Sequence, residues 1–123
     1  MLRKLICLGL AGALGTLLRY GLSGLVHRGG AMPFPWGTVV VNVAGCALAG
    51  GVWSETHLRV GSELRVIVLI GFMGAFTTFS AFALETTQLL RDGEWLLAME
   101  NVMLQNVAGI AALSVGLVIG RLL

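Results

Sequence analysis

The stretch that decides the fold spans residues 71–82 and reads Gly71-Phe72-Met73-Gly74-Ala75-Phe76-Thr77-Thr78-Phe79-Ser80-Ala81-Phe82. It lies inside a long apolar segment, yet it contains two glycines, three hydroxyl residues and four phenylalanines. Glycine and consecutive threonines are poor helix formers. Inside a bilayer, a loosened helix is tolerated only where its backbone lines a cavity or binds an ion. The stretch therefore predicts a functional break in a membrane-spanning helix.

Composition places the whole chain in a bilayer. Of its 123 residues, 57% are hydrophobic and 11% are charged, and the mean hydropathy is +0.92. Soluble domains contain roughly 25% charged residues. A chain of this length is one domain, so we expect a single transmembrane domain over residues 1–123. The net charge of +2 is too small and too dispersed to favour nucleic acid as a partner.

Apolar segments of the length needed to cross the hydrocarbon core, about 20 residues, recur along the chain. They cover about residues 5–26, 36–54, 66–90 and 96–121. Trp36 and Trp53 lie near the two ends of the second segment, as aromatic residues do at membrane interfaces. The sequence thus predicts an all-α membrane protein with four transmembrane helices, the third broken near its middle.

The positive charges indicate which side the termini occupy. Four spans put both termini on one side of the membrane. The terminal side carries Arg3, Lys4, Arg59, Arg65 and Arg121, and the other side carries Arg28 and Arg91. The positive-inside rule favours cytoplasmic termini, although the bias is modest.

An enzyme is not expected. The 2 cysteines, Cys7 and Cys46, fall in apolar stretches, where a free cysteine behaves as a small hydrophobe. The 2 histidines, His27 and His57, lie near the ends of apolar segments. These residues form neither a nucleophile–base pair nor a metal-ligand pattern.

Several polar side chains fall inside the predicted spans, where they are costly and usually face an interior or a water path. They are Arg19, Asn42, Thr77, Thr78, Ser80, Glu85, Gln105 and Asn106. Two interpretations of Arg19 stay open: it extends to an interface, or it attracts anions at a vestibule. Asn42 either bonds a neighbouring helix or donates to an ion.

Phe79 and Phe82 are three residues apart and share one face of a helix. Such a pair usually packs in a core. The alternative is that the positive edges of the rings face an anion without trapping it. Conduction requires binding that is strong enough for entry and weak enough for release.

Taken together, these segments resemble the small bacterial fluoride channels of the Fluc or CrcB family across essentially the whole chain. Three motifs carry the resemblance: residues 12–20 (GALGTLLRY), residues 36–45 (WGTVVVNVAG), and residues 71–82 (GFMGAFTTFSAF) followed by Glu85. The fourth helix matches only in its length and its glycines.

The resemblance implies a role for individual residues. Asn42 lines the ion path, Phe79 and Phe82 face the conducted fluoride, and Arg19 lies near an aqueous vestibule. The polar track between the two rings corresponds to Ser80 and Ala81. The family often has a hydroxyl at the second of these positions, and commonly a serine where this chain has Gln105.

The resemblance also implies an assembly. The family works as an antiparallel homodimer with dual topology in the bacterial inner membrane, and we expect the same here. Backbone carbonyls at the break hold a structural sodium ion in the family; by position they come from Gly74 and Thr77.

Three functions are considered for a chain with these features. The first is passive export of cytoplasmic fluoride. The second is a proton-coupled small multidrug-type transporter, which needs an acidic residue in its first span, where this chain has Arg19. The third is a non-conducting membrane assembly subunit, which leaves the features of residues 71–82 without an explanation.

Overall fold

The computed structural model describes residues 1–27, 33–56 and 61–122. Its elements, in chain order, are α1 (Leu2–His27), α2 (Trp36–Thr56), α3 (Ser62–Val66), η1 (Ile67–Met73), α4 (Gly74–Phe76), α5 (Phe79–Arg91) and α6 (Trp95–Leu122). Arg28, His57 and Arg59, which the charge and histidine arguments use, lie outside the described residues.

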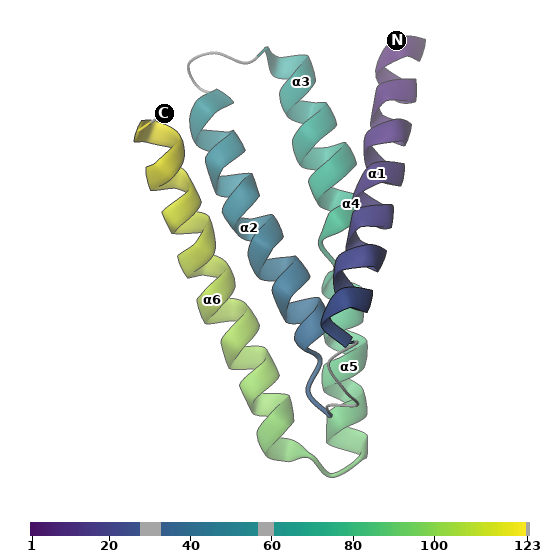
Figure 1. Ribbon diagram of the computed structural model, residues 1–123, viewed down its shortest axis with the longest axis vertical. Helices are drawn as coiled ribbons and strands as arrows, with labels where there is room; N and C mark the ends of the chain where they lie inside the picture. The colour runs from purple at the N-terminus through teal and green to yellow at the C-terminus, as the bar shows by residue number, and fades with distance from the viewer. Residues whose placement is uncertain (28–32, 57–60, 123) are drawn as a thin grey trace.

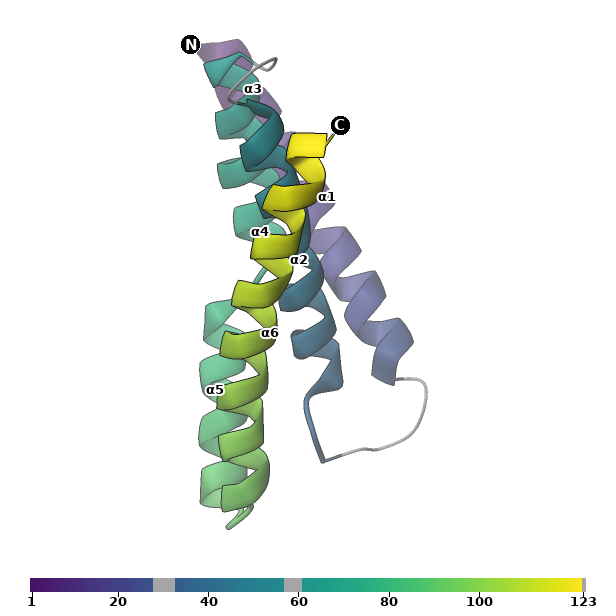
Figure 2. The same cartoon turned by 90° about the vertical axis from the view of Figure 1, so that its left-hand side faces the viewer.

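Within that part of the chain, four segments are long and apolar enough to cross a membrane. They are Leu2–His27, Trp36–Ser54, Ser62–Arg91 and Trp95–Leu122. The two termini lie at the same end of the molecule in both views (Figure 1, Figure 2). The prediction of an all-α protein with four membrane-spanning segments is confirmed.

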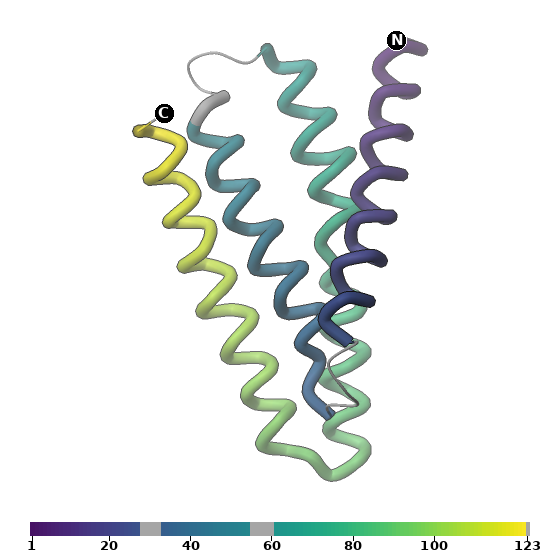
Figure 3. The backbone as a smooth tube through the Cα atoms, viewed as in Figure 1, coloured from purple at the N-terminus to yellow at the C-terminus, as the bar shows by residue number. Residues whose placement is uncertain are grey.

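The third segment is interrupted near its middle. It begins as α3, continues as the π-helix η1 and the single turn α4, and then opens at Thr77 and Thr78. Both threonines are extended, with φ/ψ of −83°/158° and −148°/106°, before α5 resumes the helix. Figure 3 shows the tube straightening at this point while the neighbouring helices continue to coil. The predicted break is confirmed, and it lies after the two glycines, because Gly74 keeps helical angles of −61° and −30°.

The two halves of the third segment contact different neighbours. The half before the break packs against α1, and α5 packs against α6. Helices α2 and α6 run side by side for most of their length (Figure 1). The break therefore lies where the third segment passes from one neighbour to the other.

Glycines allow α2 and α6 to approach closely, as small residues do between membrane helices. A Cβ atom placed on Gly50 would collide with the Leu113 carbonyl oxygen, and one on Gly116 would collide with that of Ala47. We call this contact, made by Gly50, Gly116 and Gly120, the glycine seam.

Two further glycines allow the neighbouring helices to pack closely against the segment before the break. A Cβ atom on Gly45 of α2 would collide with the Thr77 methyl group and come within 3.3 Å of the Phe76 ring. One on Gly15 of α1 would collide with the Phe72 carbonyl oxygen. Helix α1 thus packs directly against the backbone of this segment, and α2 packs against the Phe76 and Thr77 side chains.

A tight turn returns the chain from α5 to α6. Gly93 has φ of 79°, which only glycine adopts without strain, and the Glu94 N–H donates to the Leu89 carbonyl at 2.9 Å. This turn places the start of α6 beside α5, which brings Asn101 within reach of Thr86.

Candidate functional site

The break is held open by the side chain of Asn42. The Thr78 N–H donates to Asn42 Oδ1 at 2.8 Å, and Asn42 Nδ2 donates to the Thr78 carbonyl at 3.1 Å. The side-chain amide therefore satisfies both backbone groups of a residue that has left the helix. Because an unpaired backbone group is costly in an apolar setting, this pairing is what permits the extended conformation.

The threonines themselves complete the two helix ends. The Thr77 N–H and hydroxyl both donate to the Met73 carbonyl, at 3.0 and 2.9 Å. The Thr78 hydroxyl accepts from the Ala81 N–H at 3.1 Å, so Thr78 is the N-cap of α5. The Thr-Thr pair thus ends one helix and starts the next, and does more than weaken the segment.

Asn42 also contacts the fourth span. Its Nδ2 donates to Gln105 Oε1 at 2.7 Å, and Gln105 Nε2 donates to Asn101 Oδ1 at 2.9 Å. Asn101 Nδ2 in turn donates to the Thr86 hydroxyl at 2.9 Å. The sequence prediction included Asn42 and Gln105 but missed Asn101 and Thr86. Asn101 is four residues before Gln105, so its place on the same helix face was the available signal.

The two phenylalanines lie on the first turn of α5. The Phe79 and Phe82 ring centroids are 5.5 Å apart, with the ring planes inclined at 52°. Phe79 is 78% exposed, so its ring projects from the chain and is not part of a core. The Ser80 hydroxyl lies 3.3 Å from that of Thr78, whereas Ala81 contributes only its backbone N–H to the cap.

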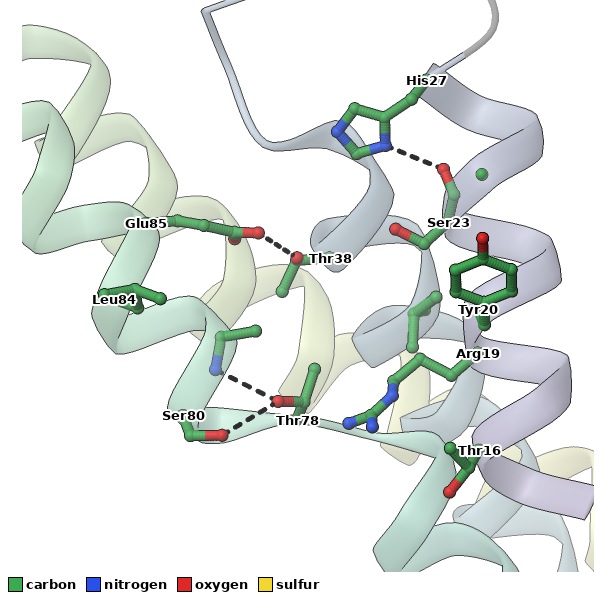
Figure 4. Close-up of a pocket in the computed structure, with 13 residues that line it drawn as sticks. Thr16, Arg19, Tyr20, Ser23, His27, Thr38, Thr78, Ser80, Leu84 and Glu85 are labelled. Atoms are coloured by element: carbon green, nitrogen blue, oxygen red, sulfur yellow. Dashed lines mark hydrogen bonds between the residues drawn. The ribbon is translucent and has the colours of Figure 1, made fainter. Parts of the chain in front are cut away.

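An open cavity of about 680 Å³ adjoins the break. Its polar and charged lining consists of Thr16, Arg19, Tyr20, Ser23, His27, Thr38, Thr78, Ser80 and Glu85. Arg19 extends from α1 into this cavity toward Thr78 (Figure 4). On the opposite wall the Thr38 hydroxyl donates to Glu85 Oε1 at 2.6 Å, a pair that the sequence did not predict.

The predicted site residues therefore form two groups that meet at Thr78. Asn42 of α2 bonds Thr78 and also Gln105 of α6, while Arg19 and Ser80 line the adjoining cavity. Asn106 is not part of either group, because it is exposed and its amide donates to the Val102 carbonyl of its own helix at 2.7 Å.

Backbone carbonyls are available before the break. In a continuous helix the Thr78 N–H would bond the Gly74 carbonyl, but here it donates to Asn42. Gly74 is exposed, and a Cβ atom placed on it would meet nothing within 4 Å. Backbone oxygens at this position have the chemistry that hard cations prefer.

These features define a small helical membrane protein of four spans, whose third span opens into a polar site shared with the second and fourth. Residues 6–117 match the family model described as "CrcB-like protein, Camphor Resistance (CrcB)". The chain belongs to this family.

Similar proteins cover the whole chain. A protein of Desulforapulum autotrophicum and one of Nitrosococcus oceani are each 51% identical to it, over 100% of both chains. A protein of Solidesulfovibrio magneticus is 50% identical over the same extent. All three are named "Fluoride-specific ion channel FluC".

Proposed function

We propose that this protein is a fluoride-selective ion channel that lets cytoplasmic fluoride leave the cell passively and so reduces fluoride toxicity. The observation that carries the proposal is the match over 100% of the chain, at 51% identity, to relatives named as fluoride-specific channels. A channel catalyses no reaction, in agreement with the expectation that the chain is not an enzyme.

The fluoride path that we propose follows the start of α5. Phe79 and Phe82 present ring edges, and Ser80 presents a hydroxyl beside Thr78. These groups carry partial positive charge but no full charge, so they replace part of the anion's water shell without trapping it. Arg19 stands at the adjoining cavity, where its guanidinium raises the local concentration of anions.

Asn42 and Gln105 border the proposed path, and their amides bond other groups of the chain. Both hydrogens of the Asn42 amide are directed at partners in the chain, the Thr78 carbonyl and Gln105 Oε1. We therefore propose that Asn42 shapes the path by fixing the break, and that Gln105 takes part by orienting Asn42.

The setting is the bacterial cell inner membrane. The four apolar segments make the chain a multi-pass membrane protein in contact with lipid, and its named relatives are bacterial. Fluoride is the conducted ion.

We further propose that the working unit is an antiparallel homodimer with dual topology. Ser80, Thr87 and Gln88 of α5 are exposed on the single chain although they lie within a membrane-spanning segment. Polar groups facing lipid are costly, so a second copy that covers them is favoured. The open space beside Gly74 offers a point of close approach.

We propose that a structural sodium ion binds at the same surface. The backbone oxygens of Gly74, the first residue of α4, and Thr77, the residue after it, are the groups that would hold it. When bound, the ion supplies positive charge between the two copies and has no redox or catalytic part. Removing sodium should therefore weaken dimerisation, which size measurement in sodium-free buffer checks.

Orientation is tested separately. A tag placed after Leu123 should be labelled from both sides of the membrane in intact cells and in inverted vesicles. Labelling from the cytoplasmic side alone would overturn the dual-topology dimer and leave the channel proposal standing.

The function itself is tested by ion efflux from liposomes that contain the purified protein. We expect fast fluoride release once a potassium ionophore balances the charge, with chloride release far slower. Equal release of both anions would contradict the proposal. Release that requires an imposed proton gradient would favour a coupled transporter instead.

A further inference from the structure

A continuous row of hydrogen bonds connects two backbone groups of the third segment through three side-chain amides. It comprises Thr78 N–H to Asn42 Oδ1 (2.8 Å), Asn42 Nδ2 to Gln105 Oε1 (2.7 Å), Gln105 Nε2 to Asn101 Oδ1 (2.9 Å), Asn101 Nδ2 to Thr86 Oγ1 (2.9 Å), and Thr86 Oγ1 to the Phe82 carbonyl (2.7 Å). We call this row the amide chain.

The direction of the amide chain is fixed at both ends. The Thr78 N–H can only donate, and the Phe82 carbonyl can only accept. Every group between them must therefore accept from the Thr78 side and donate toward Phe82. Reversing any one amide would place two donors or two acceptors face to face, so the three amides have one consistent arrangement.

Asn101 holds the centre of this arrangement. It is 0% exposed, and both ends of its amide are used, one by Gln105 and one by Thr86. Asn101 touches neither Thr78 nor the phenylalanine rings through any bond of the amide chain. Its influence on the break must pass through Gln105 and Asn42.

We propose that Asn101 is a positioning residue for the ion path: it fixes the orientation of Gln105 and Asn42 and thereby keeps the break at Thr78 open. The effect of Asn101 on conduction rests on the proposed channel function. Its effect on the break rests on the amide chain alone.

The physical consequence of losing Asn101 follows from the donor and acceptor inventory. Without Asn101 Oδ1, the Gln105 amide keeps its bond from Asn42 Nδ2 but loses the acceptor that holds its own NH₂ group, so it reverses more easily. In the reversed state its NH₂ group faces that of Asn42. Asn42 then has to turn as well, which removes the acceptor of the Thr78 N–H. The Thr86 hydroxyl keeps the Phe82 carbonyl, so the α5 end of the row is less affected.

The test compares two asparagines on one helix. Asn101→Leu removes the buried amide, and Asn106→Leu makes the same chemical change at an exposed amide that donates to the Val102 carbonyl of its own helix. Hydrogen exchange of the Thr78 backbone amide, followed by NMR in detergent, reports on the break directly. We expect exchange to accelerate about tenfold or more in Asn101→Leu, as for a buried donor that loses its acceptor, and to stay unchanged in Asn106→Leu.

A double-variant measurement distinguishes positioning of Gln105 by Asn101 from a general loosening of the fold. In a Gln105→Met background, which has no amide to orient, Asn101→Leu should add little to the exchange rate of Thr78. Thr86→Val provides a second variant that leaves Asn101 in place and removes its acceptor. It should shift Thr78 exchange in the same direction by a smaller factor.

Fluoride efflux is measured on the same variants. Faster Thr78 exchange together with at least a severalfold loss of flux in Asn101→Leu supports the proposal. Unchanged exchange in both Asn101→Leu and Thr86→Val overturns it, and so does accelerated exchange with normal flux. If the unaltered protein conducts no fluoride, the channel function fails while the exchange data still decide whether Asn101 positions the break.

Discussion

The glycine seam and the break at Thr78 satisfy the hydrogen bonds of the backbone inside the membrane in opposite ways. Along the seam, α2 and α6 keep continuous backbone hydrogen bonds and approach until glycine is the only residue that fits, as at Gly50 and Gly116. At the break, the third segment gives up helical hydrogen bonds, and the side chain of Asn42 replaces them.

The difference shows how stability and conduction are divided in this chain. The seam contributes packing and presents little polar surface, so it supports the fold. The break concentrates backbone and hydroxyl groups where an ion can use them, at the cost of requiring a partner for each group. Helix α2 takes part in both, since Asn42 and Gly50 lie two turns apart on it.

The largest effect is expected from Asn42→Leu, which removes the side chain that holds the break. The Thr78 N–H and carbonyl lose their partners, at about 1–3 kcal/mol for each group. Flux should vanish and thermal stability in detergent should fall markedly. Asn106→Leu is the control, and equal behaviour of the two variants would show that Asn42 has no special role in the break.

Flux alone should change in Phe79→Ile and Phe82→Ile. Isoleucine keeps bulk and apolarity but has no polarised ring edge, so we expect at least a roughly tenfold loss of fluoride efflux. Dimer content and melting temperature should stay near those of the unaltered protein. If both variants conduct normally, the rings serve only as packing.

Stability alone should change in Gly50→Ala, which tests the glycine seam. The added methyl group collides with the Leu113 carbonyl, and overpacking of this kind costs about 1–3 kcal/mol. Gly51→Ala is the matched control, because a Cβ atom there lies 3.8 Å from the Gly116 carbonyl, an ordinary contact. A lower melting temperature in Gly50→Ala only, with normal flux per folded protein, is the expected result of thermal melts and efflux assays.

The smallest effect is expected from Ala81→Thr. It adds a hydroxyl to the polar track beside Ser80 and should leave fluoride efflux equal or slightly higher. The backbone N–H of residue 81 already caps onto Thr78, so the fold has no reason to change. A complete loss of efflux would mean that residue 81 does not border the path.

How far the sequence predicts this molecule differs between the two regions. The spans follow from hydropathy and length, and the break follows from the run of glycine and threonine in residues 71–82. Its position does not follow, because both glycines stay helical, Gly71 against α1 and Gly74 in open space, while Thr78 leaves the helix to pair with Asn42. The position of the break therefore depends on a contact between residues that are far apart in the chain.

The candidate site shows the same limit. Polar residues inside spans indicated Asn42, Ser80 and Gln105 individually, but not that Asn42 and Gln105 bond each other. Asn101 was not among the predicted site residues, and the turn at Gly93 places it against Thr86. Helix periodicity alone relates Asn101 to Gln105 and carries no information about α5.

The central claim, passive and selective conduction of fluoride, is tested most directly by the reversal potential of the protein in a planar bilayer. With a fluoride gradient as the only difference between the two chambers, selective fluoride conduction predicts a reversal potential that follows this gradient. That potential should not move when chloride or pH is then changed on one side. A reversal potential that follows the proton or the chloride gradient would contradict it.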